Sequence, residues 1–304
     1  MSKLKQLAGQ TALYGISTIL VRSLNWLISP FHTYVFGSRQ SELGIIIEMY
    51  SYVAFINVIL MYGMETAFFR YASDNKENQN KVFSTSLLSL GLSTSFFLIL
   101  ILLFSQNIAN ALQYPNLQSI VIMLAFILAF DTMSNIPFAK LRLEAKPLSY
   151  IKIKLFNVII TVGLNFFLLF PLLKNQNDMF GFHLKEEDAI FYVFLANLVA
   201  SAATFAIFVP DFFRSKFEFC KKTWKDLMRF GLPLVIVGLA GIVNETIDRI
   251  LLKYLLPQET LADRNAQVAI YGSVYKLAIF MSLVVQAYKM GAEPFFFKQA
   301  KDED

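Results

Sequence analysis

Cationic residues inside long apolar runs are the positions of this sequence with the clearest capacity for chemistry. They are Arg22, Arg249 and Lys276. A charge at the centre of a membrane helix costs roughly 3 kcal/mol, so each should face a wet cavity or a partner. A guanidinium stays charged when desolvated, and its planar fork fits a diphosphate, which makes Arg22 the sharpest candidate. We predict that these cations bind substrate, although Glu245 stands one helical turn before Arg249 and could neutralise it.

Carboxylates in the same runs give a second kind of candidate site. Asp131, Glu48 and Asp248 could bind a coupling cation, either a proton or a sodium ion, as carboxylates do in cation-coupled carriers. The structural alternative is that they pair with neighbouring cations, for example Asp131 with Arg22. Both interpretations remain open at this stage.

Two pairs with the same spacing lie where apolar runs end. Glu65 precedes Arg70 by as many residues as Glu293 precedes Lys298. We predict that these four residues form a gate or salt bridges that stabilise a lobe, rather than contacts with substrate. Asparagines within the runs, such as Asn57, are expected to join helices through hydrogen bonds.

The elements that position these residues are predicted to be membrane helices. Of the 304 residues, 56% are hydrophobic and only 16% are charged, well below the charged quarter usual in soluble domains. Eight apolar runs are each long enough to cross the roughly 30 Å of bilayer hydrocarbon as a helix. The runs are Ala12 to Phe36, Ile45 to Phe69, Val82 to Phe104, Ile120 to Phe138, Leu155 to Leu173, Ala189 to Pro210, Phe230 to Leu256 and Val268 to Phe297. The predicted fold class is an all-α membrane protein with about eight transmembrane helices.

The distribution of basic residues predicts how the chain is oriented. The amino terminus, every second loop and the carboxyl end together carry 18 Lys and Arg, whereas the remaining loops carry four. Lys and Arg are retained on the cytoplasmic side during insertion. The net charge of +5 therefore reports topology, not nucleic-acid binding. We expect a multi-pass protein of the cell inner (plasma) membrane with a cytoplasmic amino terminus.

Catalytic and cofactor signatures are missing from the sequence. It has neither a phosphate-binding Gly-rich loop nor a His-Glu-x-x-His motif, and its single cysteine, Cys220, excludes an intrachain disulfide framework. The loops are too short for a soluble catalytic domain. We expect no enzyme activity, no cofactor and no bound metal.

An internal repeat suggests two related lobes. After a shift of 228 positions, the segment Gly63 to Ala72 meets the segment Gly291 to Ala300, and the same register pairs Gly44 with Gly272. Both segments end helices that run in the same direction, so the repeat is parallel and its period is six helices. We predict a six-helix amino-terminal lobe over residues 1–210 and a cytoplasmic amphipathic linker over residues 211–228. Residues 229–304 would be the first two helices of a second, truncated lobe.

With these motifs in view, the chain resembles the polysaccharide-exporter branch of the multidrug, oligosaccharidyl-lipid and polysaccharide exporter superfamily, which includes the Wzx-type O-antigen flippases. The resemblance covers essentially the whole chain and rests on the order and spacing of several short motifs. They are Gln10-Thr-Ala-Leu-Tyr-Gly15, Gly63-Met-Glu-Thr-Ala-Phe-Phe-Arg70, Ile136-Pro-Phe-Ala-Lys-Leu-Arg142 with Lys146-Pro147, Phe230-Gly-Leu-Pro233 and Asp248-Arg249.

The resemblance implies two lobes that face each other across a cavity open to alternate sides. It implies outward movement of an undecaprenyl-diphosphate-linked oligosaccharide, such as an O-antigen or capsule repeat unit. The expected partners are this lipid-linked substrate, the bilayer and polysaccharide-assembly proteins. The alternatives are a cation-coupled multidrug exporter of the same superfamily and, with weaker support, a membrane-embedded O-antigen polymerase or ligase.

Overall fold

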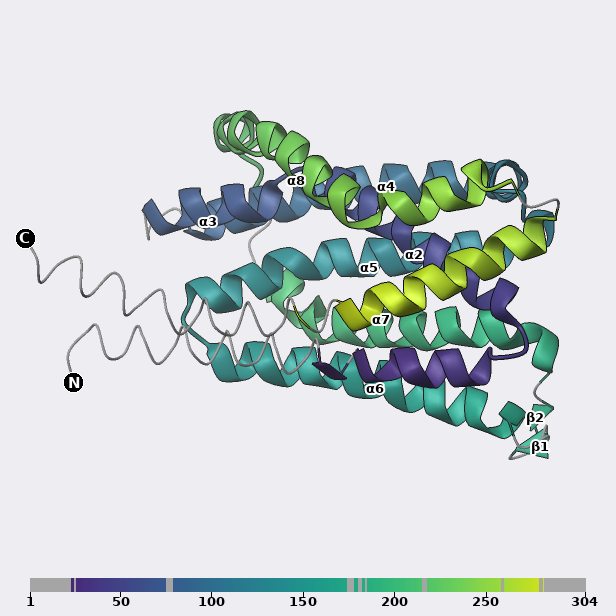
Figure 1. The fold of residues 1–304 in the computed structure, drawn as a ribbon. Helices are drawn as coiled ribbons and strands as arrows, with labels where there is room; N and C mark the ends of the chain where they lie inside the picture. The colour runs from purple at the N-terminus through teal and green to yellow at the C-terminus, as the bar shows by residue number, and fades with distance from the viewer. Residues whose placement is uncertain are drawn as a thin grey trace, which may run out of the picture.

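The computed structural model describes residues 23–24, 26–74, 79–173, 178–179, 182–183, 185–214, 218–257, 260–278 and 281, and nearly all of them are helical (Figure 1). Residues 26–35 and 261–278 also form helices. The labelled helices are α2 (Gln40–Met61), α3 (Met64–Asp74), α4 (Gln79–Ala111), α5 (Gln118–Leu143), α6 (Pro147–Leu173), α7 (Ala189–Arg214) and α8 (Lys221–Leu255). Short elements lie between them: the 3-10 helices η2 (Pro115–Leu117) and η3 (Glu186–Asp188), and the strands β1 (Asp178–Met179) and β2 (Phe182–His183), which pair antiparallel.

The prediction of an all-α membrane protein is confirmed. Within the described ranges, six helical spans are long and apolar enough to cross a membrane. Each covers the corresponding predicted run to within one residue and usually continues past it, as α8 does by beginning at Lys221 rather than Phe230. A helix satisfies its own backbone hydrogen bonds, so it can extend into the polar interface at no cost. The first and eighth predicted spans lie partly outside the described residues.

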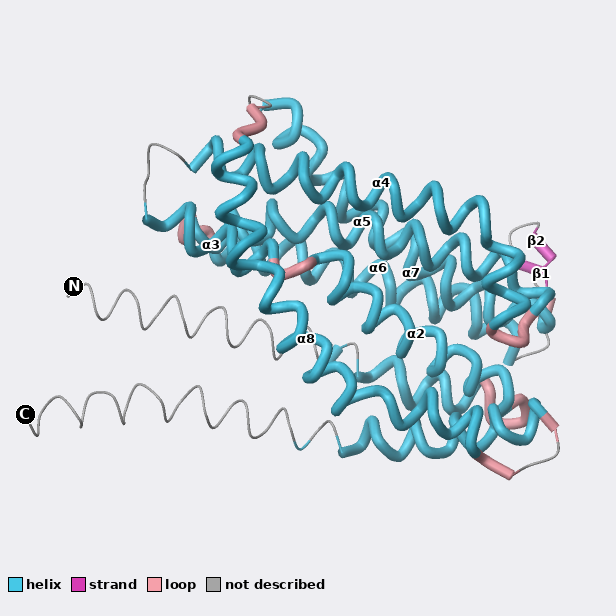
Figure 2. Tube along the Cα trace, turned by 90° about the horizontal axis from the view of Figure 1, so that it is seen from above, coloured by secondary structure: helices cyan, strands magenta, loops and turns pink. Residues whose placement is uncertain are grey.

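The helices run side by side along one axis of the molecule (Figure 1). The hairpin of β1 and β2 marks one end, here called the hairpin end, and α3 marks the other, called the α3 end. Helix α5 packs mainly against α4 and α7, and α6 packs against α7, whereas α8 packs mainly along α2 and α3. Viewed from above, α8 lies beside α2 and α4 to α7 gather on the other side of α2 (Figure 2). The charge pattern predicts that the α3 end is cytoplasmic.

Two apolar clusters fill the interior, one toward each end. The cluster toward the hairpin end includes Phe36, Ile127 and Phe194. The cluster toward the α3 end includes Phe138 and Phe208. Along α5 and α7, polar residues occupy the turns between these clusters, so a polar layer crosses the bundle between two apolar ones.

A break separates α2 from α3 inside one membrane span. Tyr62 and Gly63 have φ values of 33° and 71°, so the chain passes through the left-handed region there. A Cβ atom on Gly63 would lie 2.3 Å from the carbonyl oxygen of Gly231 in α8. Both the backbone conformation and the close approach therefore require glycine. The contact brings together two of the motifs that carry the family resemblance.

Helix α2 also approaches the helix of residues 261–278 too closely for any side chain at the crossing. A Cβ on Gly44 would lie 1.9 Å from the carbonyl oxygen of Asn265, and one on Gly272 would meet the side chain of Ile47. The two glycines that the repeat register pairs thus both lie at this crossing. The repeat itself stays a prediction.

We expect Gly44→Ala to destabilise the protein, because the clash is with backbone and only separation of the two helices relieves it. The melting temperature in detergent should fall clearly. Gly163→Ala is the matched control, since a Cβ there meets nothing within 4 Å. It should be neutral or stabilise by about 0.5–1 kcal/mol through helix propensity. Equal melting temperatures for the two variants would contradict the close crossing.

Candidate functional site

A buried ion pair joins α2 to α8 near the hairpin end. The ammonium of Lys253 donates a hydrogen bond of 2.9 Å to Glu48 Oε1, and the two side chains are 0% and 1% exposed. Lys253 also donates to the carbonyl of Leu112 at 2.6 Å and lies over the ring of Tyr114, with 3.9 Å between the nitrogen and the ring centroid. Paired and hydrogen-bonded, the two charges are tolerated in the interior.

Tyr114 extends this contact to a further segment. Its hydroxyl donates to Glu48 Oε2 at 2.5 Å and contacts Asn265 Oδ1 at 3.0 Å. We call Glu48, Lys253, Tyr114 and Asn265 the latch. The latch links α2 and the connection after α4 to α8 and the helix of residues 261–278. Sequence reasoning proposed Glu48 for cation coupling, which stays a prediction, and it missed Lys253.

Two of the three predicted substrate-binding cations lie close to each other. Arg249 and Lys276 are near enough to interact electrostatically. The guanidinium of Arg249 lies 4.2 Å from the ring centroid of Tyr275. The indole of Trp26 donates to the carbonyl of Lys276 at 2.8 Å, which brings the helix of residues 26–35 to the same place. We call Arg249 and Lys276 the cation pair.

The cation pair has no carboxylate partner within 4.0 Å among the described residues. Glu245, expected to neutralise Arg249, is exposed and makes no ion pair with it. Two neighbouring cations that lack a counterion repel each other, and an anion placed between them would relieve that repulsion. The geometry therefore suits a phosphate or diphosphate group.

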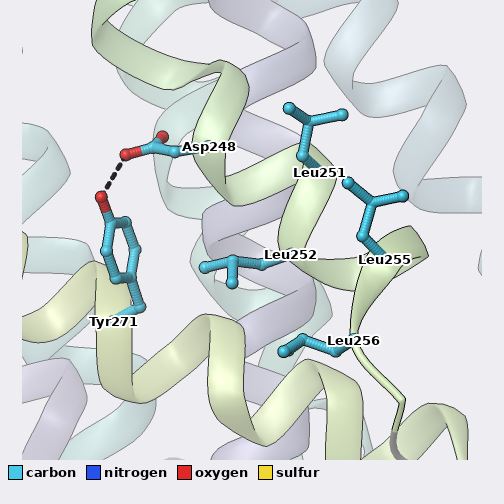
Figure 3. Close-up of a pocket in the computed structure, with 6 residues that line it drawn as sticks. All are labelled: Asp248, Leu251, Leu252, Leu255, Leu256 and Tyr271. Atoms are coloured by element: carbon cyan, nitrogen blue, oxygen red, sulfur yellow. Dashed lines mark hydrogen bonds between the residues drawn. The ribbon is translucent and has the colours of Figure 1, made fainter.

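Asp248 lies at one end of an apolar groove between α8 and the helix of residues 261–278 (Figure 3). Its carboxylate accepts a hydrogen bond from the Tyr271 hydroxyl and another from the backbone N–H of Arg249. The remaining walls of this groove of about 240 Å³ are leucines. Asp248 is thus engaged by two donors, and the prediction that it couples to a cation stays untested.

Asp131 lies in the polar layer described above, where residues of four helices line a cavity of about 230 Å³. The residue is deep between helices yet accessible to solvent. The cavity is lined by Asn57, Asp131, Ser134, Asn135, Phe138, Lys154, Asn157, Asn197, Ser201 and Thr204. Lys154 was counted from the sequence as a topology signal, but it lies two turns inside α6 and its charge interacts with Asp131.

At the α3 end, Glu65 and Arg70, which were predicted to form a gate or salt bridges, contact different helices. Glu65 forms an ion pair with Arg142 of α5 and not with Arg70. The guanidinium of Arg70 instead lies 4.4 Å from the ring centroid of Phe230 in α8. Arg70 thus joins α3 to α8, whereas Glu65 joins α3 to α5. Arg22, Glu293 and Lys298, also predicted as site residues, lie outside the described residues.

Cys220 precedes α8 at the α3 end, outside the membrane spans. Hydrogen bonds from the side chain and backbone of Thr223 lower the pKa of the thiol from 9.0 to about 7. We expect its alkylation rate to rise with pH with a midpoint near 7, because only the thiolate reacts and it forms above the pKa. Thr223→Val should move the midpoint upward. A midpoint above 8 in the unmodified protein would contradict these hydrogen bonds.

Long apolar helices with buried, paired charges define a multi-pass helical membrane protein. Residues 7–299 match the model of a family described as polysaccharide biosynthesis protein. The chain belongs to this family, which is that of the Wzx-type flippases in the superfamily that the sequence resembles. Neither the curated proteins nor the solved structures contain a match to the chain.

Proposed function

We propose that the protein is a flippase that moves an oligosaccharide, linked through a diphosphate to undecaprenol, from the cytoplasmic to the outer leaflet of the inner membrane. The observation that carries the proposal is the cation pair, because two membrane-embedded cations without a described counterion suit a diphosphate. Membership of the polysaccharide biosynthesis family supports a saccharide as the transported group. In this proposal Arg22 adds a third cation to the same binding site.

Alternating access supplies the mechanism in this proposal. The helices before residue 211 form one lobe, and α8 with the helix of residues 261–278 begins the other. The latch holds the lobes together at the hairpin end, predicted to be the outer end. Release of substrate outward requires the latch to open, and the closed latch corresponds to a state that loads from the cytoplasmic side.

The membrane potential favours the proposed direction. Moving one charge through 100 mV changes the free energy by about 2.3 kcal/mol, so two diphosphate charges gain about 4–5 kcal/mol when they leave an inside-negative cell. This gain requires that the cations stay in place, as residues fixed on α8 and the following helix do.

Transbilayer movement in proteoliposomes tests the proposal. The substrate is a polyprenyl diphosphate sugar whose fluorescent label is destroyed by impermeant dithionite. With the protein present, the pool in the inner leaflet should become accessible, whereas in protein-free liposomes it stays protected. Continued protection with the folded protein would count against flipping. Dye efflux that requires a sodium or proton gradient would favour the multidrug-exporter alternative.

A further inference from the structure

The polar cavity around Asp131 is lined by a carboxylate and an ammonium that form no ion pair with each other. Asp131 on α5 interacts with the hydroxyl of Ser201, whereas the ammonium of Lys154 lies 4.2 Å from the ring centroid of Phe138. The two described side chains form no ion pair within 4.0 Å, although both line the same cavity. A carboxylate and an ammonium that line one cavity without pairing with each other favour polar contents over apolar ones, because a charge in contact with apolar matter alone is costly. The cavity is therefore expected to hold a polar occupant.

The charges restrict what this occupant can be. A metal cation beside Asp131 would be opposed by Lys154, and an anion beside Lys154 would be opposed by Asp131. A hydroxyl group meets both requirements, because it donates to a carboxylate and accepts from an ammonium. The cavity thus favours an uncharged molecule that carries several hydroxyl groups.

The remaining lining also has unused hydrogen-bonding capacity. Asn57 Oδ1 is buried and has no hydrogen-bond partner in the part of the chain that the structure describes. Among the described residues, the amide nitrogen of Asn135 is hydrogen-bonded to the sulfur of Met61, at 3.2 Å. A buried acceptor without a donor costs about 1–3 kcal/mol, so an occupant that supplies the donor is favoured.

The volume of the cavity limits the size of the molecule that it can hold. A volume of about 230 Å³ equals the space of about eight water molecules at about 30 Å³ each. This is the space of one sugar ring with its hydroxyl groups, and it is too small for an oligosaccharide. The apolar clusters on both sides, with Phe194 toward the hairpin end and Phe208 toward the α3 end, limit the occupant to the polar layer.

We propose that this cavity is a sugar subsite that binds one ring of the transported saccharide, with hydroxyl groups between Asp131 and Lys154 and on the amides of Asn57 and Asn135. The subsite rests on the proposed function for its role, since a flippase for lipid-linked saccharides would position the glycan there while the cation pair holds the diphosphate.

Protection of a single cysteine tests the subsite directly. Cys220 is the only cysteine of the sequence, so Ser201→Cys in a Cys220→Ser background places one thiol at the cavity wall. A small hydrophilic thiosulfonate modifies this thiol in the absence and presence of glucose, galactose, mannose or N-acetylglucosamine. At least one sugar should slow modification, by about threefold at twice its Kd, because occupied cavities are unavailable.

Matched variants separate the subsite from general effects. Asp131→Ala and Lys154→Met should each abolish protection, whereas Lys152→Met, an exposed lysine on the same helix, should retain it. Native Cys220 in the unmodified chain should show no protection by sugar. If Ser201→Cys does not fold, the melting temperature of the unmodified protein is measured with the same sugars and should rise with at least one of them. Lys154→Met should show no such rise.

Three outcomes would overturn the subsite. They are the absence of protection or stabilisation by any sugar, protection that Asp131→Ala retains, and protection by sodium ions alone, which would assign a cation site. Flipping and sugar binding can fail separately. Transport without protection by sugar would reject the subsite and leave the proposed function intact. Protection by sugar without transport would reject the proposed function and leave a sugar-binding cavity.

Discussion

Replacing Lys253 by methionine is expected to destabilise the protein by about 3–5 kcal/mol. The substitution keeps most of the side-chain volume but leaves the Glu48 carboxylate, which is 1% exposed, without its counterion. Tyr114 would remain the donor to the Glu48 carboxylate, but a neutral hydroxyl cannot balance its charge. The lost ammonium contacts both Glu48 and the carbonyl of Leu112. Denaturant or thermal unfolding in detergent measures the loss.

Two further variants make this result specific to the latch. Lys222→Met removes an exposed lysine from the same helix, α8, and should change stability by less than about 0.5 kcal/mol. Adding Glu48→Gln to Lys253→Met should restore part of the lost stability, because no uncompensated charge remains. A double variant as unstable as the sum of its single variants would show that the two residues act independently, contrary to the latch.

Neutralising the cation pair is expected to weaken binding of a polyprenyl diphosphate by about two orders of magnitude or more. A hydrogen bond to a charged group contributes about 1.5–3 kcal/mol, and each 1.4 kcal/mol is a tenfold change in Kd. Arg249→Ala combined with Lys276→Ala removes both groups. Binding of the fluorescent lipid to the purified protein measures the change, and unfolding temperatures confirm that the variant is folded.

The matched control for this variant removes the same net charge elsewhere. Lys222→Ala combined with Lys225→Ala takes two exposed cations from the start of α8, outside the cation pair. Its Kd should change by less than about threefold at moderate salt, because exposed charges are screened. Equal losses in the two double variants would mean that net charge, not the cation pair, attracts the lipid.

Much of the fold was predictable because a membrane helix requires a long run of apolar residues, which is easily recognised in a sequence. The apolar runs identified the described spans, since about 20 apolar residues are needed to cross the hydrocarbon. Helix ends were less predictable, as the early start of α8 at Lys221 shows. The break at Tyr62 and Gly63 was also missed, because the approach of Gly231 that accompanies it comes from a helix distant in sequence.

The site was less predictable because its contacts join residues far apart in the chain. Glu48 and Lys253 are 205 positions apart, and a lysine near the end of an apolar run is ordinarily expected to extend its amine toward water. Lys154 directly precedes the predicted run that begins at Leu155, so its position inside a helix was not expected from the sequence. The intramembrane asparagines were predicted to link helices, which fits Asn157 with Thr204 but not Asn57, whose side-chain oxygen has no partner among the described residues.

A disulfide between the two proposed lobes, formed while transport is measured, tests most directly whether the lobes must separate. Thr33 and Ser273 lie on the helices of residues 26–35 and 261–278, and their hydroxyl oxygens are 3.5 Å apart. Cysteines at both positions, in a Cys220→Ser background, are close enough for a disulfide. In proteoliposomes, oxidation should stop the transbilayer movement of the polyprenyl diphosphate sugar, and reduction should restore it. Movement at the same rate with the disulfide formed would contradict the claim that these helices must separate for the substrate to cross.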